Sequence, residues 1–513
     1  MSAHELEAPR TAGADRGFSP GLGLAAAGFG AALTILAFPP YGIWPLAFGM
    51  WAPLAFGLAG ASPRAAFATA WVYTVAMALA ISHWIPLPLM ADFGISPLRA
   101  WTFTAGLIGV YALVPAAAVA VWAWTTRRWP GSVWAAAWRF AGIVALGEAL
   151  RAGPLQFPWL LSGHALAPAP LFLQVADLGG VAAPTFLVVS IGAGLGLALA
   201  RRDARCLALP VVGGLLCAGY GAFRLGEPVT RGRGVEIGVV QAAVLPSERF
   251  LPDSARRNVL RHLLATRTLL DTGPLDLVVW AETSVDAYLE SEPGLMTGLQ
   301  RFVDRTGTPL VTGAPRRRAP GVQTNSVVLF TPGAREPENY DKQRLVPFAE
   351  YDPPLSVWLE PLIGELASDE PFTPGHEATV LRRGPLPMAA PVCFEITYAD
   401  EMRAFRRGGA ALLLNLSNDA WFGPTGFARV HLGHAVFRAV ELRSWIVRGA
   451  NTGISAVIDP AGRIVAQLPA FEQGTLRATV YPAGPPPFFA RFGAGPFLSA
   501  LALGVLISLR ASR

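Results

Sequence analysis

Seven apolar stretches, each long enough to cross a bilayer as a helix, occupy most of the first 225 residues. Crossing the hydrocarbon core takes about 17 to 25 mainly apolar residues. An eighth stretch lies near the end of the chain. Pro and Gly interrupt or shorten the second and the eighth, but lipid-embedded helices tolerate both residues. The predicted helices are 21–37, 43–58, 65–81, 101–124, 133–150, 182–200, 206–223 and 495–509.

The composition also indicates a membrane protein. Of the 513 residues, 52% are hydrophobic and 15% are charged, whereas about 25% are charged in a typical soluble domain. The first sixteen residues are polar, and they lack the apolar core and cleavage site of a removable signal peptide. We therefore expect the first helix to act as an uncleaved signal.

Arginines near the helix ends predict the orientation, because cytoplasmic loops carry an excess of Lys and Arg. With the N-terminus inside, the inner loops hold most of these arginines, and the segment 234–482 lies outside after seven crossings. The same arginines account for the formal charge of +6. No basic run with interleaved aromatic residues occurs, so nucleic acid is not an expected partner. The inner set is Arg10, Arg16, Arg64, Arg127, Arg128, Arg139, Arg201, Arg202, Arg205, Arg510 and Arg513.

The segment 234–482 has the pattern of an α/β domain, in which short apolar runs alternate with amphipathic stretches. Most of the runs are apolar on both faces, which indicates sheets covered on both sides. Residues 458–468 predict a hairpin, and the Pro-rich 483–488 predicts a stiff linker. The predicted strands are 236–244, 275–282, 308–314, 324–330, 388–395, 411–418 and 454–460, and the predicted helices are 255–270, 294–305, 399–407 and 428–445. The predicted divisions are a tail (1–20), a seven-helix region (21–225), an α/β domain (234–482) and a last helix with its tail (490–513).

Cys393 is one of only three cysteines and ends an apolar run in the sequence PVCFEITY. The other two, Cys206 and Cys217, lie on the seventh predicted helix, so we expect Cys393 to be a free thiol. A nucleophilic thiol needs a base and a group that stabilises the oxyanion. Glu282 and Lys342 follow two other predicted strands and could supply these roles. The alternative to a catalytic role is that Cys393 is a small core residue and that Glu282 and Lys342 are solvated surface charges.

Three short motifs identify a resemblance. WAETS with Glu282, YDKQRLVPFAEY with Lys342 and Glu350, and VCFE with Cys393 resemble the Glu-Lys-Cys set of the nitrilase (carbon–nitrogen hydrolase) superfamily. Three further segments, LLLNLSNDAWFG, HLGHAVFRAVE and NTGISAVIDPAGRI, make the whole outer domain similar to the apolipoprotein N-acyltransferase family. The layout of seven helices, a domain and one helix is also that of the family.

The resemblance implies a role for each matching residue. Glu282 would be the general base, Lys342 would stabilise the tetrahedral oxyanion, and Cys393 would hold the acyl group as a thioester. Glu350 would orient Lys342. Glu395 and Trp421 would shape the pocket and contact substrate, with a paired polar residue and a core aromatic as the alternatives. Two positions depart from the family: Phe394 stands where a tyrosine is frequent, and Phe250 stands where relatives can carry a tryptophan.

The resemblance further implies an α-β-β-α sandwich on the periplasmic side of a bacterial inner membrane, in a monomer without a cofactor. The implied reaction transfers an acyl chain from a phospholipid to the α-amino group of a diacylglyceryl-cysteine, in two steps through Cys393. Two other accounts stay open. In one, water resolves the thioester, as in an amidase. In the other, an inactive domain binds lipid or lipoprotein.

Three other features of the sequence suggest further hypotheses. The segment 351–375, with Trp358 and Leu362, could be an apolar lid on the lipid surface or a packed loop. Within the fifth predicted helix, Arg139 could snorkel to the interface and Glu148 could be a buried partner. His431 and His434 are three residues apart on a predicted helix without an evident third ligand, so we expect a helix surface and no metal site.

Overall fold

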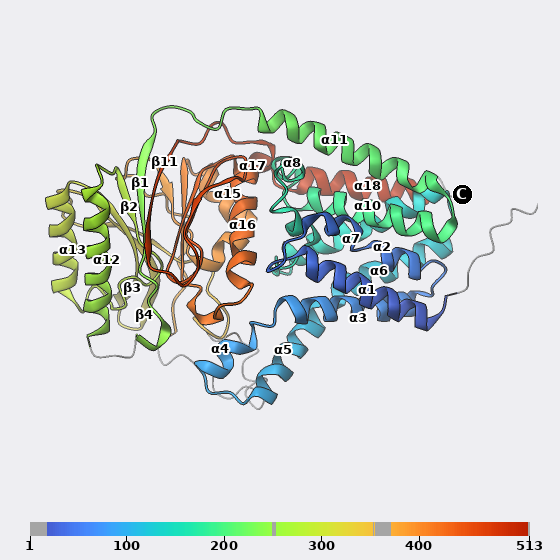
Figure 1. Ribbon diagram of the computed structural model, residues 1–513, viewed down its shortest axis with the longest axis horizontal. Coiled ribbons are helices and arrows are strands. Elements are labelled where there is room, and N and C mark those ends of the chain that lie inside the picture. The colour runs from blue at the N-terminus through green and yellow to red at the C-terminus, as the bar shows by residue number, and fades with distance from the viewer. Residues whose placement is uncertain (1–17, 249–252, 352, 354–370, 511–513) are drawn as a thin grey trace, which may run out of the picture.

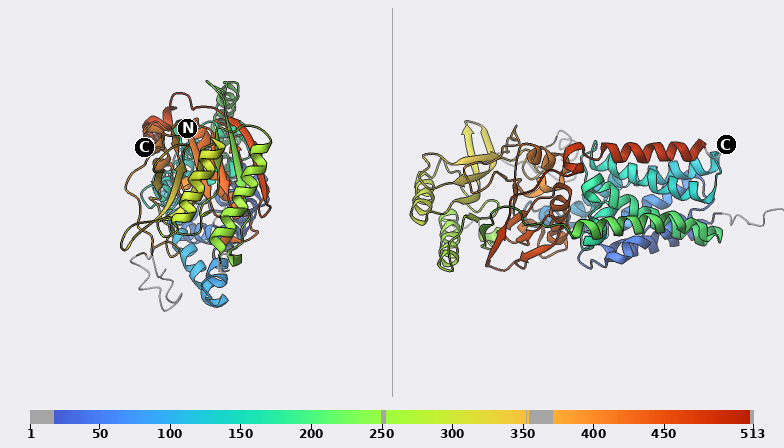
Figure 2. Two further views of the ribbon diagram at one scale, coloured as in Figure 1. Left: turned by 90° about the vertical axis from the view of Figure 1, so that its left-hand side faces the viewer. Right: turned by 90° about the horizontal axis from the view of Figure 1, so that it is seen from above.

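The computed structural model describes residues 18–248, 253–351, 353 and 371–510. A helical bundle and an α/β domain lie end to end, and the chain leaves the bundle after α11 and returns to it through α18 (Figures 1 and 2). The predicted fold class, a membrane helix bundle with an α/β domain, is confirmed at this level. Phe250, Trp358 and Leu362 lie outside the described residues, as does most of the segment 351–375.

The bundle contains helices that match the predicted apolar stretches. Among the described residues, five helical stretches are long and apolar enough to cross a membrane: Pro20–Ala37, Pro63–Ile81, Pro97–Arg128, Ala182–Arg201 and Ala204–Leu225. The number of eight crossings stays a prediction. The main elements are α1 (Pro20–Ala37), η1 (Trp44–Gly49), α2 (Ala52–Gly57), α3 (Pro63–Ile81), α4 (Pro86–Ala91), α5 (Pro97–Tyr111), α6 (Leu113–Arg128), α7 (Val133–Ala152), η2 (Ser162–Leu166), α8 (Pro170–Leu173), α9 (Ala176–Gly179), α10 (Ala182–Arg201), α11 (Ala208–Leu225) and α18 (Gly495–Arg510).

Two predicted helices are interrupted in the structure. The stretch 43–58 forms the 3₁₀ helix η1 and the short helix α2, and the stretch 101–124 divides into α5 and α6 at Ala112. A proline removes the hydrogen bond to the carbonyl four residues earlier and its ring clashes with that carbonyl. Pro53 and Pro115 place these breaks next to residues 49 and 111, where the elements end.

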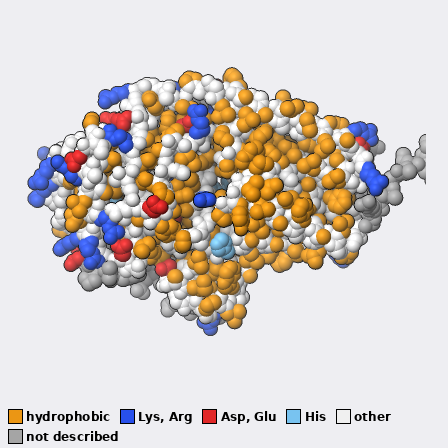
Figure 3. Space-filling model, in the orientation of Figure 1, with side chains coloured by type: hydrophobic (Ala, Val, Ile, Leu, Met, Phe, Trp, Pro, Cys, Tyr) orange, Lys and Arg blue, Asp and Glu red, His pale blue; other side chains and the backbone are white. Residues whose placement is uncertain are grey.

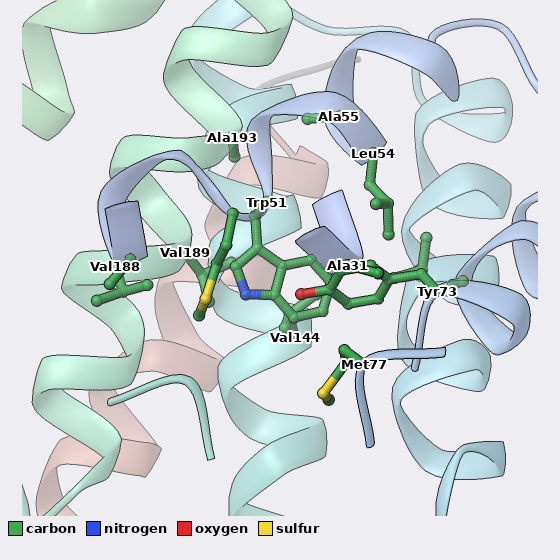
Figure 4. Packing of buried hydrophobic residues seen from close by; sticks show 14 of the residues in the cluster. Ala31, Trp51, Leu54, Ala55, Tyr73, Met77, Val144, Val188, Val189 and Ala193 are labelled. Carbon is green, nitrogen blue, oxygen red and sulfur yellow. The ribbon is translucent and has the colours of Figure 1, made fainter. Parts of the chain in front are cut away.

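Small residues let the bundle pack closely around a few large rings. Trp51 and Tyr73 lie against each other with ring centroids 5.2 Å apart, and Ala31, Ala55 and Ala193 surround them (Figure 4). At Gly196 an added Cβ would lie 2.2 Å from the Ala52 carbonyl oxygen. Membrane helices associate in this way because small side chains allow backbones to approach.

The surface of the bundle is apolar. Hydrophobic side chains cover its face in Figure 3, while charged ones gather on the α/β domain and at the far end of the bundle. The exposed residues include Leu215, Leu216 and Phe223 on α11 and Leu503 and Leu506 on α18. A soluble protein rarely exposes so large an apolar area, so this surface indicates contact with lipid.

The α/β domain consists of two sheets between two pairs of helices, the α-β-β-α order that the resemblance implies (Figure 1). Helices α12 and α13 cover the six-stranded sheet, and α15 and α16 cover the five-stranded sheet on the side of the bundle. The six-stranded sheet has the order β11 (Gly474–Val480), β1 (Val235–Gln241), β2 (Leu277–Val279), β3 (Leu310–Ala319), β4 (Val322–Phe330) and β5 (Glu338–Asp341). The five-stranded sheet has the order β10 (Ile464–Gln467), β9 (Ala456–Ile458), β8 (Ile446–Ala450), β7 (Leu412–Ser417) and β6 (Met388–Ala389).

The four predicted helices of the domain are present, as α12 (Ser254–Asp271), α13 (Pro293–Thr306), α15 (Ala399–Arg407) and α16 (Phe427–Leu442). The predicted hairpin 458–468 is present as the antiparallel pair β9 and β10. The predicted strand 388–395 is much shorter than expected. Only β6 and an isolated bridge from Val392 to Leu416 are extended, because the chain turns at Cys393.

Candidate active site

Glu282, Lys342 and Cys393 meet where the two sheets face each other. Glu282 lies three residues after β2, and Lys342 directly follows β5, so both come from the six-stranded sheet. Cys393 comes from the five-stranded sheet, at the start of the 3₁₀ helix η5 (Cys393–Thr397). The three residues are 6%, 1% and 8% exposed, so the alternative of solvated surface charges does not apply.

The ammonium group of Lys342 lies between two carboxylates. Its Nζ donates to Glu350 Oε1 at 2.9 Å and to Glu282 Oε1 at 3.4 Å. The side-chain amide of Asn325 on β4 donates to the same two oxygens, at 2.8 and 2.9 Å. The backbone N–H of Val346 donates to the other oxygen of Glu350 at 2.7 Å. Glu350 thus has the position that the resemblance implies, beside Lys342.

Asn325 was missed in the sequence because it lies within the apolar strand TNSVVLF. Its signal is the presence of an amide in a run that is otherwise buried, since buried polar groups need partners. Lys342 carries a second signal. It is the only lysine of the chain, and the other residues among the 41 Lys and Arg are arginines. A compact ammonium, unlike a guanidinium, can lie at one point between two carboxylates.

The charges around Lys342 and Cys393 set their protonation. Burial alone would lower the pKa of Lys342, but Glu350 and Glu282 outweigh it and raise that pKa above its ordinary value. Burial, followed by Glu282, raises the pKa of Cys393, while Lys342 opposes the rise. At neutral pH the resting site therefore contains an ammonium and a thiol, and a base must take the thiol proton during attack.

Glu395 has the contacts of a structural carboxylate. It accepts from Tyr340 Oη at 2.7 Å and from the backbone N–H groups of Val392 and Gln343, both at 2.7 Å. Burial, the largest cause, raises its pKa to about 7. These contacts join the turn at Cys393 to the loop after Lys342, so the alternative of a paired polar residue describes Glu395 best.

The aromatic candidates lie toward the bundle. Phe394 stacks on Trp159, with centroids 5.4 Å apart and an angle of 25° between the rings. Trp159 belongs to the loop before η2, and it also contacts Phe427 and His434 of α16 at 5.7 and 5.0 Å. Trp421 is half-buried in the 3₁₀ helix η6 (Ala420–Phe422), so it is not a core aromatic.

The predicted helix surface for the two histidines is wrong. His431 and His434 are 0% and 1% exposed, because α16 is covered by the sheet on one side and by the bundle on the other. Ligand atoms of Cys393, Asp419 and His431 lie within 4.8 Å of one another, a spacing compatible with a metal ion. The guanidinium of Arg448 lies 2.8 Å from Asp419 Oδ2 and 3.1 Å from His431 Nδ1, so a cation of the chain already pairs with two of these three residues.

The charged residues of α7 have separate partners. Arg139 donates to the carbonyl of Ala135 within α7 and to those of Thr125 and Trp129 near the end of α6. Glu148 accepts from Ser162 through its backbone N–H at 2.8 Å and its hydroxyl at 2.6 Å. Glu148 is therefore buried as expected, and its partner is the η2 turn.

Two family models match this chain. The carbon–nitrogen hydrolase family model matches residues 237–484, and the model of the apolipoprotein N-acyltransferase N-terminal domain matches residues 30–194. The apolipoprotein N-acyltransferase of Azotobacter vinelandii is 34% identical over 506 residues, which cover 94% of each chain. The chain belongs to the apolipoprotein N-acyltransferase family. That of Geobacter metallireducens is 30% identical and covers 90% of each chain.

Family membership confirms the resemblance seen in the sequence. Because the relatives are bacterial and five helices can cross a membrane, the chain is a bacterial membrane protein. A solved amidase from Nesterenkonia sp. is 18% identical and covers 53% of this chain and 98% of its own, with a TM-score of 0.40. The assignment therefore rests on the family models and the full-length relatives.

Proposed function

We propose that the protein transfers an acyl chain from a phospholipid to the α-amino group of the N-terminal diacylglyceryl-cysteine of an apolipoprotein, through a thioester on Cys393. The observation that carries this proposal is the buried group of Glu282, Lys342 and Cys393, together with the stacking of the adjacent Phe394 on Trp159 of the bundle.

In the first half-reaction, Glu282 takes the proton of the Cys393 thiol as sulfur attacks the ester carbonyl of the phospholipid. Lys342 stabilises the oxyanion that forms, and it keeps its charge because Glu350 and Glu282 raise its pKa. When the intermediate collapses, the C–O bond breaks and the protonated Glu282 gives its proton to the leaving lysophospholipid. The acyl group stays on sulfur.

In the second half-reaction, the amine of the apolipoprotein attacks the thioester. Glu282 accepts a proton from the attacking nitrogen, Lys342 again stabilises the oxyanion, and the C–S bond breaks. Glu282 then returns the proton to the cysteine sulfur. Glu350 and Asn325 orient Lys342 and Glu282 throughout, because each contacts the atoms that those side chains use.

The position of the site next to the bundle supports a lipid substrate. Exposing an acyl chain to water costs about 0.8 kcal/mol per CH₂, or roughly 12 kcal/mol for sixteen carbons. A site beside the membrane avoids this cost. We place the domain (234–482) on the periplasmic side of the bacterial inner membrane, with the helical region (21–225) and the last helix (490–513) in the bilayer. The arginines at the far end of the bundle support this orientation.

The test uses the purified full-length protein and the mass of its Cys393 peptide. After incubation with phospholipid, we expect an acyl adduct that hydroxylamine removes. Addition of a diacylated lipopeptide should clear the adduct and place the chain on the peptide amine. Cys393→Ala serves as the control without adduct. Release of free fatty acid instead would indicate hydrolysis, and a lipid-bound protein without an adduct would indicate a binding protein.

A further inference from the structure

A buried polar network lies next to Cys393. Ser417 ends β7, and its hydroxyl lies 3.5 Å from Cys393 Sγ and 2.6 Å from Asp419 Oδ1. Arg448 on β8 donates to the Ser417 oxygen at 3.1 Å and to Asp419 Oδ2 at 2.8 Å. Ser417, Asp419 and Arg448 are 0%, 3% and 0% exposed. The roles proposed above for the triad leave this network without a function.

The network also fixes the backbone of Cys393. Its φ of +49° is rare for a residue other than glycine and costs about 1 to 3 kcal/mol unless the surroundings hold it. His431 Nε2 and the side-chain amide of Asn415 donate to the Cys393 carbonyl, at 3.1 and 3.3 Å. These bonds hold the backbone turn at Cys393. Gly453 leaves the room that Asp419 needs, since a Cβ there would lie 2.2 Å from Asp419 Oδ2.

The protons of this network can be assigned. Burial, followed by Arg448, lowers the pKa of His431, so the ring is neutral. Its Nε2–H donates to the Cys393 carbonyl, and Nδ1, which lies 3.1 Å from Arg448 and 3.1 Å from Asp419 Oδ1, accepts from Arg448. Burial alone would raise the pKa of Asp419, but the Arg448 guanidinium holds it below its ordinary value, so Asp419 is a carboxylate. Ser417 therefore has one hydrogen for two acceptors, the carboxylate and the sulfur.

We propose that Ser417 is a further catalytic residue, whose hydroxyl donates to Asp419 while Cys393 is a thiol and turns to Sγ whenever the sulfur carries negative charge. No covalent bond of Ser417 changes. Its hydrogen bond stabilises the sulfur as Glu282 removes the thiol proton. It does so again when the amine expels the thiolate and the electron pair of the broken C–S bond moves to sulfur. Arg448 keeps the Ser417 oxygen in place during both steps. This inference rests on the proposed function for its role in turnover.

Alkylation of Cys393 by iodoacetamide tests the inference without any lipid. The rate is followed across pH by the mass of the Cys393 peptide, because Cys206 and Cys217 are also free. The charged groups around the sulfur are Glu282, Lys342 and Asp419, with Arg448 and the neutral His431 behind them. In Ser417→Ala the Cys393 thiolate loses a hydrogen-bond donor. The pH at which the alkylation rate is half-maximal, called the midpoint below, should therefore rise by about one unit. In Asp419→Asn it should fall, because a nearby negative charge is gone and Ser417 is freed.

Opposite shifts in the two variants distinguish catalysis from packing, since a structural defect has no reason to reverse sign. Ser444→Ala is the matched control, because Ser444 is also 0% exposed and donates only to the Leu442 carbonyl. Ser417→Thr keeps the hydroxyl, so its alkylation midpoint should lie close to that of the wild type. In the transfer assay, Ser417→Ala should slow both half-reactions about tenfold.

An unchanged midpoint in Ser417→Ala, or shifts of the same sign in both variants, would overturn the role of Ser417. If Ser417→Ala does not fold, Asp419→Asn decides: a lower midpoint supports the inference, and an equal or higher one contradicts it. If the wild-type protein transfers no acyl chain, the proposed function fails, but the alkylation midpoints still report on Ser417.

Discussion

The bundle and the α/β domain both bury charged side chains, and the charges near Cys393 are neutralised differently from Glu148 of the bundle. Near Cys393, charges meet opposite charges: Lys342 lies between two carboxylates, and Asp419 pairs with Arg448. In the bundle, Glu148 is held by neutral donors from Ser162 and Thr185. Arg151 has its guanidinium 4.1 Å over the ring of Tyr111.

These two kinds of partner, neutral donors and opposite charges, indicate two roles for buried charges in this chain. A carboxylate held by neutral donors fastens one segment to another, as Glu148 fastens η2 to α7. A charge held by an opposite charge stays ionised in a dry site, and its partner's charge can act on a reacting group. We therefore expect substitutions in the domain to affect turnover and substitutions in the bundle to affect stability.

Lys342→Met should have the largest combined effect on turnover and stability. It removes the oxyanion stabiliser and leaves the carboxylates of Glu282 and Glu350 buried without a cation. Thioester formation should fall by about 10² to 10³-fold, and the free energy of unfolding should fall by about 3 to 5 kcal/mol. The acylated Cys393 peptide and unfolding in detergent measure the two. Lys342→Arg keeps the charge but cannot place it at one point, so it should recover stability more than activity.

Glu350→Gln comes next, because a neutral amide orients Lys342 less well than a carboxylate. Loss of one charge-assisted hydrogen bond predicts a decrease in kcat/KM of roughly tenfold to a hundredfold. Asp271→Asn, which disrupts an exposed ion pair with Arg267, is the control and should leave the rate unchanged. Equal rates for the two variants would contradict an orienting role for Glu350.

Glu282→Gln should separate the charge of the base from its proton transfer. Thioester formation should be lost. The pH midpoint of Cys393 alkylation should fall, on the order of one unit, because Glu282 is one of the groups that raise the pKa of the thiol and Lys342 remains. The rate of alkylation at neutral pH should therefore rise in this variant. A higher midpoint would show that Glu282 does not act on Cys393 through its charge.

Glu148→Gln should have the smallest effect on turnover. The amide cannot accept from both donors of Ser162, so the free energy of unfolding should fall by about 1 to 3 kcal/mol. The acyl transfer rate should stay within roughly threefold of the wild type, since Glu148 contacts no reacting group. A decrease in the acyl transfer rate as large as that of Glu350→Gln would contradict the comparison. It would show that Glu148 contributes to the reaction.

The sequence predicts the parts of this molecule that depend on local pattern. Apolar length places α1, α3 and α10, and helical spacing places α12 and α15 to within a residue or two. The interruptions between η1 and α2 and at Ala112 follow from Pro53 and Pro115, whose effect on the carbonyl four residues earlier can be predicted from the sequence.

The remaining parts depend on contacts between distant residues. Motif resemblance names Glu282, Lys342 and Cys393, but it does not identify Asn325 or Ser417, which act through hydrogen bonds across strands. The burial of His431 and His434 results from the packing of α16 against both the sheet and the bundle, and helical spacing within one segment cannot report a second covering surface.

The stacking of Phe394 on Trp159 ties the residue next to the nucleophile to a loop of the membrane region. The membrane region thus packs directly against the residue that follows Cys393. A water-soluble fragment without the bundle would keep Glu282, Lys342 and Cys393 but lose the ring that packs against Phe394. The bundle therefore supports the site as well as anchoring the protein.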